Sequence, residues 1–130
     1  SVLSAAPSFW PQMQLELVSQ NDAVAQAKTV GRITQSSLPN GRDLFQELLG
    51  NEGYRRTVLV SLAESDYLDS SGIGWLLKHH KQFEKAGGKL VLHSIPPTVM
   101  QVLKVLRLPM VLHVAKDLAE ARAMAPEEAA

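Results

Sequence analysis

Residues 57–77 read TVLVSLAESDYLDSSGIGWLL, and this stretch decides the fold class. Residues 57–63 are apolar at both odd and even positions and rich in β-branched side chains, which is typical of a central strand covered on both faces. From Ser70 onward, apolar and aromatic residues recur at helical spacing. They are Ile73, Leu76, Leu77, His80, Phe83 and Ala86. A buried strand that leads through a loop into a helix predicts an α/β crossover.

The residues before this stretch predict two strands and a short helix. Apolar and polar side chains alternate over residues 12–18, the period-two pattern of a half-buried strand. After a short turn, residues 23–33 are expected to form a second strand that pairs with the first as a hairpin. Asp43 can cap a short helix, which Gly50 or Gly53 would end.

The residues after it predict two further strand–helix units. Residues 89–95 are expected to form a short strand, and a third helix is expected to begin at Pro96-Pro97 and to end before Pro109. The inner side of that helix is expected to carry Val99, Val102, Leu103 and Leu106. A last strand over 110–115 and a helix from Asp117 complete the order β-β-α-β-α-β-α-β-α. The predicted fold class is α/β, with a mixed sheet of about four to five strands flanked by helices.

Composition limits the classes of protein that this chain can be. Its 130 residues are 45% hydrophobic and 20% charged, which is typical of one globular domain. We expect that domain over residues 12–124, with tails at 1–11 and 125–130. Lys and Arg together number 13, as do Asp and Glu, so the formal net charge is 0 and a nucleic-acid partner is disfavoured.

Several other classes are disfavoured by particular residue types. The absence of cysteine excludes disulfides, thiolate metal sites and thiol nucleophiles. The four histidines form no H-x-x-x-H pair, so no metal is expected. No Gly-Lys-Ser/Thr motif is present, and Gly72-Ile73-Gly74 lacks the last glycine of a dinucleotide loop, so no other cofactor is expected. Ser70 lacks the Gly-x-Ser-x-Gly context of a hydrolase nucleophile, so we expect no catalytic residue and no enzyme. No apolar run approaches the roughly 18–20 residues of a membrane span, and no signal peptide is evident, so we expect a cytoplasmic protein without membrane insertion.

The candidate functional residues are Asp69, Ser70, Ser71 and Gly72. They stand at a strand–loop–helix junction, where free backbone N–H groups of the helix favour a negative charge. A phosphate on Ser70 would gain about 0.3–1 kcal/mol from each favourable interaction with the helix dipole. The plainer alternative is that Ser70 or Ser71 is only the helix N-cap, with Asp69 capping or turning the loop.

Trp75 is a second candidate for binding. On the predicted helix it lies away from the apolar stripe, beside Lys78 and His79, so its indole is expected to face outward. Tryptophan is enriched in interface hot spots, which makes Trp75, Lys78 and His79 candidate partner-binding residues. The alternative is that Trp75 covers Met100 or Val105 on the next helix.

Residues 67–74, YLDSSGIG, resemble the signature of the STAS domain family, which includes the bacterial anti-sigma factor antagonists. Residues 83–90, FEKAGGKL, are similar to the helix end and Gly-Gly turn of that family, and residues 95–108 to its next strand-to-helix passage. The resemblance implies that Ser70, directly after Asp69, is phosphorylatable. Residues 31–35, GRITQ, depart from the acidic stretch that many members carry in a loop of the partner surface.

The resemblance also implies a function. It predicts a phosphorylation-switched binding module that docks an anti-sigma factor of the histidine-kinase-like ATPase type while Ser70 is unmodified, with a serine phosphatase to reverse the modification. Asp69, Ser71 and Gly72 would support the switch, and Thr34 would add to the partner surface. Two alternatives stay open: a STAS scaffold or transporter-associated regulatory domain without phosphorylation, and a nucleotide- or lipid-responsive binding domain.

Overall fold

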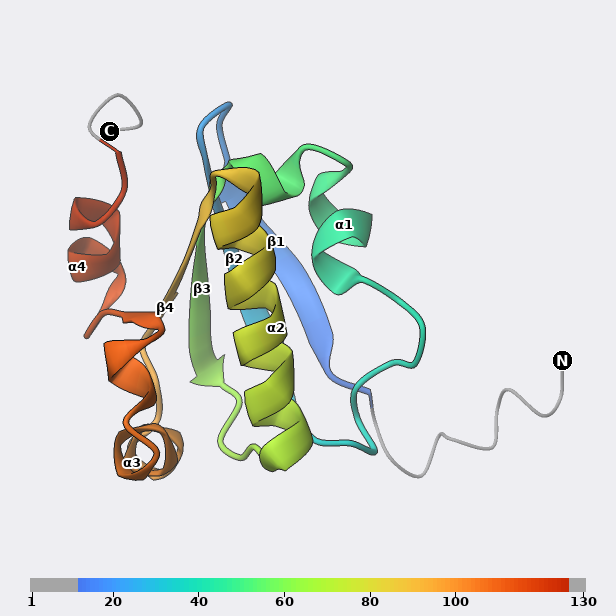
Figure 1. Ribbon diagram of the computed structural model, residues 1–130, viewed down its shortest axis with the longest axis vertical. Helices are drawn as coiled ribbons and strands as arrows, with labels where there is room; N and C mark the ends of the chain where they lie inside the picture. Colours follow the sequence, from blue (N-terminus) through green and yellow to red (C-terminus); the bar gives the residue numbers. More distant parts are fainter. Residues whose placement is uncertain (1–11, 127–130) are drawn as a thin grey trace, which may run out of the picture.

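The computed structural model describes residues 12–126, so the tail expected at 1–11, and all but the first two residues of the tail expected at 125–130, lie outside the described residues. Its sheet has five strands in the order β1-β2-β3-β4-β5, with β1 and β2 antiparallel and the other neighbours parallel (Figure 1). Their bounds are β1 Gln14–Gln20, β2 Val24–Val30, β3 Thr57–Glu64, β4 Lys89–His93 and β5 His113–Val114. The predicted mixed α/β fold is therefore confirmed.

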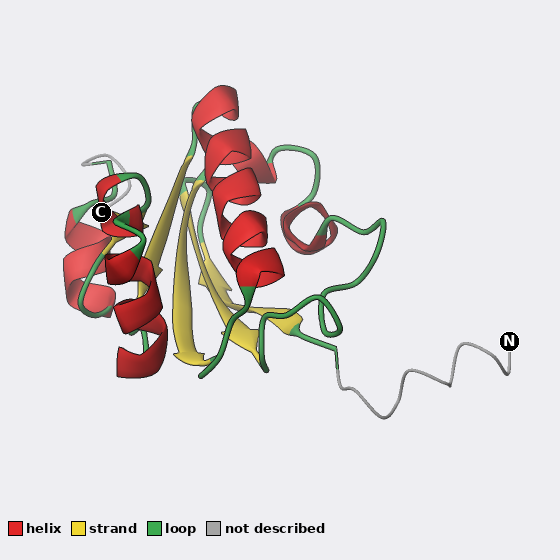
Figure 2. Ribbon diagram, turned by 60° about the horizontal axis from the view of Figure 1, so that its bottom comes forward, coloured by secondary structure: helices red, strands yellow, loops and turns green. Residues whose placement is uncertain are grey.

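Within residues 12–126, four α-helices and two short 3-10 helices accompany the strands. They are α1 Leu44–Leu49, η2 Gly53–Arg55, α2 Ser70–Ala86, α3 Pro97–Val105, η3 Leu108–Met110 and α4 Leu118–Ala123. Helices α1 and α2 cover one face of the sheet, and α4 packs on β3 and β4 from the other (Figure 2). Helix α3 lies at the end of the sheet from which α2 begins (Figure 1).

Strand β3 is covered on both faces, as its sequence predicts. Val58, Val60 and Leu62 belong to the main hydrophobic cluster, which also contains side chains of α1, α2 and α3. Leu59, between them, belongs to the second cluster, with Ala121 of α4. These four β3 side chains are at most 1% exposed, so the strand positions the loop after Glu64 from a rigid core.

Two details of the C-terminal part differ from the prediction. The last strand covers only His113–Val114, because Leu108–Met110 forms a 3-10 turn and Pro109 has no N–H to give to a strand ladder. The inner side of α3 buries Val99 and Leu103, but Val102 and Leu106 are 36% and 50% exposed. Expecting Val102 and Leu106 on the inner side was therefore wrong, because a helix of nine residues at the end of a sheet has only one covered side.

Candidate functional site

The start of helix α2 is built around Asp69. This residue is the N-cap, and its Oδ1 accepts a hydrogen bond from the backbone N–H of Gly72 at 3.0 Å. Ser70 is the first helical residue and is exposed, whereas Ser71 is half-buried. Of the plainer alternative, the capping role of Asp69 is confirmed, whereas Ser70 or Ser71 as the N-cap is wrong. Neither serine is needed to begin the helix.

Asp69 also fixes a second loop. Its Oδ2 accepts from the backbone N–H of Gln35 at 3.1 Å, and its own N–H donates to the carbonyl of Ile33 at 3.3 Å. The N–H of Ile33 in turn donates to the carbonyl of Tyr67 at 3.0 Å. These bonds hold the loop after β2 against the loop after β3.

The electrostatics of this turn follow from the same bonds. Partial burial acts to raise the pKa of the Asp69 carboxyl, but donation from the backbone N–H groups of Gln35, Gly72 and Ser71 outweighs it and holds the pKa below its ordinary value. Asp69 is thus an anion near neutral pH, and both of its oxygens already have partners. Its carboxylate acts on the two loops and not on the Ser70 hydroxyl.

Gly72 is required by a close approach between backbones. A Cβ atom at this position would lie 2.2 Å from the carbonyl oxygen of Ile33 and 3.0 Å from the Cβ of Leu68. Gly74, which follows on the same helix, has nothing within 4 Å of the place where a Cβ would be. The absence of a side chain at Gly72 therefore allows α2 to begin in contact with the loop that carries Ile33. Gly74, in contrast, has room for a side chain.

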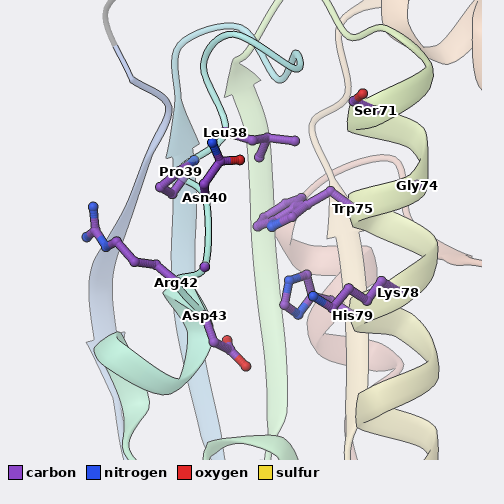
Figure 3. Close-up of a pocket in the computed structure, with 11 residues that line it drawn as sticks. Leu38, Pro39, Asn40, Arg42, Asp43, Ser71, Gly74, Trp75, Lys78 and His79 are labelled. Atoms are coloured by element: carbon purple, nitrogen blue, oxygen red, sulfur yellow. The ribbon is translucent and has the colours of Figure 1, made fainter. Parts of the chain in front are cut away.

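A cavity of about 500 Å³ lies beside this helix start, between residues 38–43 and helix α2 (Figure 3). Trp75 and His79 point from α2 toward those residues (Figure 3). The Trp75 indole is half-buried and stacks on Phe45 of α1, with ring centroids 5.6 Å apart. The α2 side of the cavity is formed by Ser71, Gly74, Trp75, Lys78 and His79.

Both sequence interpretations of Trp75 were wrong. Its ring neither faces outward freely nor covers Met100 or Val105 on α3, because it stacks on Phe45. The helical wheel identified only the side of α2 that faces the sheet. A second side of α2 is also covered, because α1 lies against it. Lys78 lies at the rim of the cavity and is exposed.

His79 is 2% exposed, so its expected place on the surface was also wrong. Its Nδ1 lies 2.7 Å from the Tyr54 hydroxyl, which lies 2.8 Å from both carboxylate oxygens of Asp43. The single hydroxyl proton of Tyr54 is donated to Asp43, so Nδ1–H of His79 donates to Tyr54. Burial lowers the pKa of His79 to about 4 and raises that of Tyr54, where hydrogen bonding to Asp43 acts in the same direction.

Thr34 lies in a second cavity, of about 460 Å³, which it shares with Asp69. Its hydroxyl lies 3.2 Å from that of Ser36 and donates to that of Ser37 at 3.1 Å. At the rim, the guanidinium of Arg32 lies 4.5 Å from the ring centroid of Tyr67, a cation–π contact between the two loops. The sequence analysis missed Arg32 and Tyr67, although an aromatic residue three positions before a candidate serine was a usable signal.

The predicted site residues therefore fall into two groups around the exposed Ser70. Asp69 and Thr34 line one cavity, and Ser71, Trp75, Lys78 and His79 line the other, whereas Gly72 lines neither. Over residues 12–126, no group of three or more His, Asp or Glu side chains is arranged to hold a metal ion. In the same range, no helix is long and apolar enough to cross a membrane.

The protein is thus a small α/β domain with a mixed five-stranded sheet. Its helix α2 begins at an Asp-Ser pair whose aspartate is the N-cap. A sequence model of the STAS domain matches residues 13–121 of this chain. The chain belongs to the STAS domain family.

Solved structures that share this fold include the following three. A Thermotoga maritima protein proposed to be an anti-sigma factor antagonist has a TM-score of 0.72 at 19% identity, over 82% of this chain and 91% of that one. The anti-sigma factor antagonist SpoIIAA in its unphosphorylated form has a TM-score of 0.60 at 16% identity, over 84% and 94%. An anti-sigma-factor antagonist (STAS) domain protein from Planctomyces limnophilus has a TM-score of 0.62 at 16% identity, over 85% and 97%.

Proposed function

We propose that this protein is an anti-sigma factor antagonist of bacteria, a cytoplasmic binding module rather than an enzyme, whose domain spans residues 12–124. It docks an anti-sigma factor of the histidine-kinase-like ATPase type while Ser70 is unphosphorylated, and a serine phosphatase restores that form. The observation that carries the proposal is the position of Ser70: an exposed hydroxyl on the first residue of α2, whose backbone is held by the Asp69 cap. A kinase can reach this hydroxyl without unfolding the domain.

The expected switch is electrostatic. A phosphate adds a charge of about −1.5 to −2 and would stand beside the Asp69 carboxylate, which already takes the N–H of Gly72. The helix dipole keeps the phosphorylated domain folded, but the backbone donors near Ser70 are partly in use. The phosphate charge would therefore stay on the docking surface and weaken the complex by repulsion and desolvation.

The docking surface would consist of Ser70 and the rims of the two cavities beside it. Thr34 stands on one side and Trp75 with Lys78 on the other. His79 would contribute through Tyr54 and Asp43, by fixing the cavity wall, because its own side chain is buried. Ser71 and Gly72 would support the switch by shaping the first turn of α2.

The test uses candidate kinase-type anti-sigma factors from the same genome. Each is incubated with the full chain and ATP, the modified residue is located by mass spectrometry, and calorimetry compares the affinity of the modified and unmodified forms. We expect phosphate on Ser70 and a loss of affinity with it. Equal affinity of the two forms would favour a STAS scaffold that is not switched by phosphorylation.

A further inference from the structure

Helix α3 exposes apolar residues on the side that faces away from the core. Its inner residues Val99 and Leu103 are at most 2% exposed, whereas Val105 is 74% exposed and Val102 is 36% exposed. Apolar exposure continues past the helix, with Leu106 at 50%, Met110 at 82% and Val111 at 50%. The outer side also carries the exposed polar residues Thr98, Gln101 and Lys104, but apolar residues exposed together on one surface mark an interaction site, so this patch needs an explanation.

The same helix borders a concave site. A cavity of about 510 Å³ is lined by Ile95, Pro97, Met100, Gln101, Lys104 and Val105. Trp75 could have covered Met100 or Val105, but its indole stacks on Phe45 of α1 instead. The Trp75 indole therefore does not cover this groove.

The charges beside the groove indicate what kind of partner surface would fit into it. Between Ile95 and Val111 the sequence contains no carboxylate residue, but it contains two cationic ones, Lys104 and Arg107. Lys104 lines the groove and Arg107 follows the helix, and both are exposed. Neither pairs with a carboxylate within the range 12–126.

We propose that this groove, residues 95–105 with the apolar turn after it, is a second docking surface that binds an acidic amphipathic helix of another protein. Apolar side chains of that helix would enter the groove beside Met100 and Val105, and its carboxylates would pair with Lys104 and Arg107. A second copy of the same surface is a poor occupant, because a two-fold contact would bring these cations together. The groove is also pre-organised, since Thr98 Oγ1 donates to the carbonyl of Asp66 at 3.1 Å and fixes the start of α3.

This second surface does not depend on phosphorylation of Ser70. The two proposals therefore fail separately: an unphosphorylated protein can still bind the acidic helix, and a working phosphorylation switch can exist without it. The Ser70→Asp variant should bind the acidic helix as the wild type does.

The test uses two synthetic peptides of about 18 residues, or five helical turns, with Leu at i, i+3, i+4 and i+7 positions and either Glu or Lys elsewhere. Amide NMR shifts of the full chain should move and saturate over residues 95–111 with the Leu/Glu peptide, and that peptide should bind at least about tenfold more tightly than the Leu/Lys peptide. The double change Lys104→Glu with Val105→Ser should abolish the shifts. Val18→Ser, at a position 58% exposed on β1, is the matched control and should leave them intact.

Three results would overturn the proposal. Equal affinity for the two peptides, or none for either, would show that the surface does not select an acidic helix. A concentration-dependent dimer that Val105→Ser dissolves would assign the surface to a second copy. Sedimentation of the protein with phosphatidylglycerol vesicles but not with phosphatidylcholine vesicles, lost in Lys104→Glu with Val105→Ser, would assign it to a lipid surface.

Discussion

The carboxylate of Asp69 accepts the backbone N–H of Gln35, 34 positions earlier in the chain, at a distance of 3.1 Å. The same carboxylate caps helix α2 through the N–H of Gly72. The Asp69 side chain thus joins the first turn of α2 to the loop after β2. Both segments line the proposed docking surface. The shape of that surface depends on this residue.

Two substitutions of Asp69 distinguish the contributions that its two hydrogen bonds make to stability. The asparagine introduced by Asp69→Asn can still cap α2, but its amide group cannot accept from the Gln35 N–H while its oxygen accepts from Gly72. We expect a loss of about 1 kcal/mol of stability for Asp69→Asn and about 2 kcal/mol for Asp69→Ala, which removes both acceptors. Urea unfolding, monitored by circular dichroism, measures the order of stability of the three proteins. Equal stability of wild type and Asp69→Asn would show that the Gln35 bond contributes nothing.

Two glycines on α2 form a matched pair. Gly72→Ala places a Cβ atom 2.2 Å from the Ile33 carbonyl oxygen, whereas Gly74→Ala meets nothing within 4 Å. We expect Gly72→Ala to cost about 2–3 kcal/mol through overpacking, and Gly74→Ala to be neutral or to stabilise by about 0.5–1 kcal/mol, because alanine favours helix. Thermal unfolding of both variants decides it, and similar melting temperatures would contradict the close approach at Gly72.

The sequence predicts the centre of this fold well because the signals there are local. Strand β3 and helix α2 are recognisable from residues 57–77 alone, since burial on both faces and helical spacing are properties of neighbouring residues. Asp43 and Asp117 were also identified correctly as the residues at which helices begin, and their side chains accept from the N–H groups three positions later. Each of these features lies within one element or its end.

The errors arise where two distant segments meet. Trp75 and His79 were placed outside because nothing in α2 itself shows that α1 covers a second side of the helix. The Asp69–Gln35 bond was missed because its donor is a backbone N–H, a group that every residue except proline carries. The candidate serine was found from its local motif, but the groups that shape its surroundings come from elsewhere in the chain.

Acid should destabilise the protein through His79. Burial depresses its pKa to about 4, so the unfolded chain, with a histidine pKa of about 6.5, binds the proton first. This contribution to stability is complete above about pH 6.5 and is lost as the pH falls from there toward 4, by up to about 3 kcal/mol. Urea unfolding between these pH values measures the slope.

The variant His79→Gln provides the control for this titration. A neutral amide cannot take up the proton, so the variant should lose less stability between pH 6.5 and 4 than the wild type. His80 and His93 also have lowered pKa values, chiefly through burial, and they keep part of the slope in both proteins. NMR titration separates the three rings, and a His79 ring that titrates near the ordinary histidine pKa of about 6.5 would contradict its buried neutral state.

Charge at position 70 separates a phosphorylation switch from a permanent scaffold. Ser70 is exposed and is not the cap of α2, so neither Ser70→Ala nor Ser70→Asp removes a bond that begins the helix, and an acid in the first turn is favourable for the dipole. If the hydroxyl lies under a docked anti-sigma factor, an unpaired carboxylate there should cost at least about 2 kcal/mol, roughly 30-fold in affinity, and loss of the hydroxyl about 1 kcal/mol or less. We expect Ser70→Ala to bind nearly as the wild type and to resist phosphorylation, Ser70→Asp to bind weakly, and Ser71→Ala to be phosphorylated normally. Calorimetric titration of the three variants, with circular dichroism to establish folding, measures this, and wild-type affinity of Ser70→Asp would leave the scaffold as the better account of this surface.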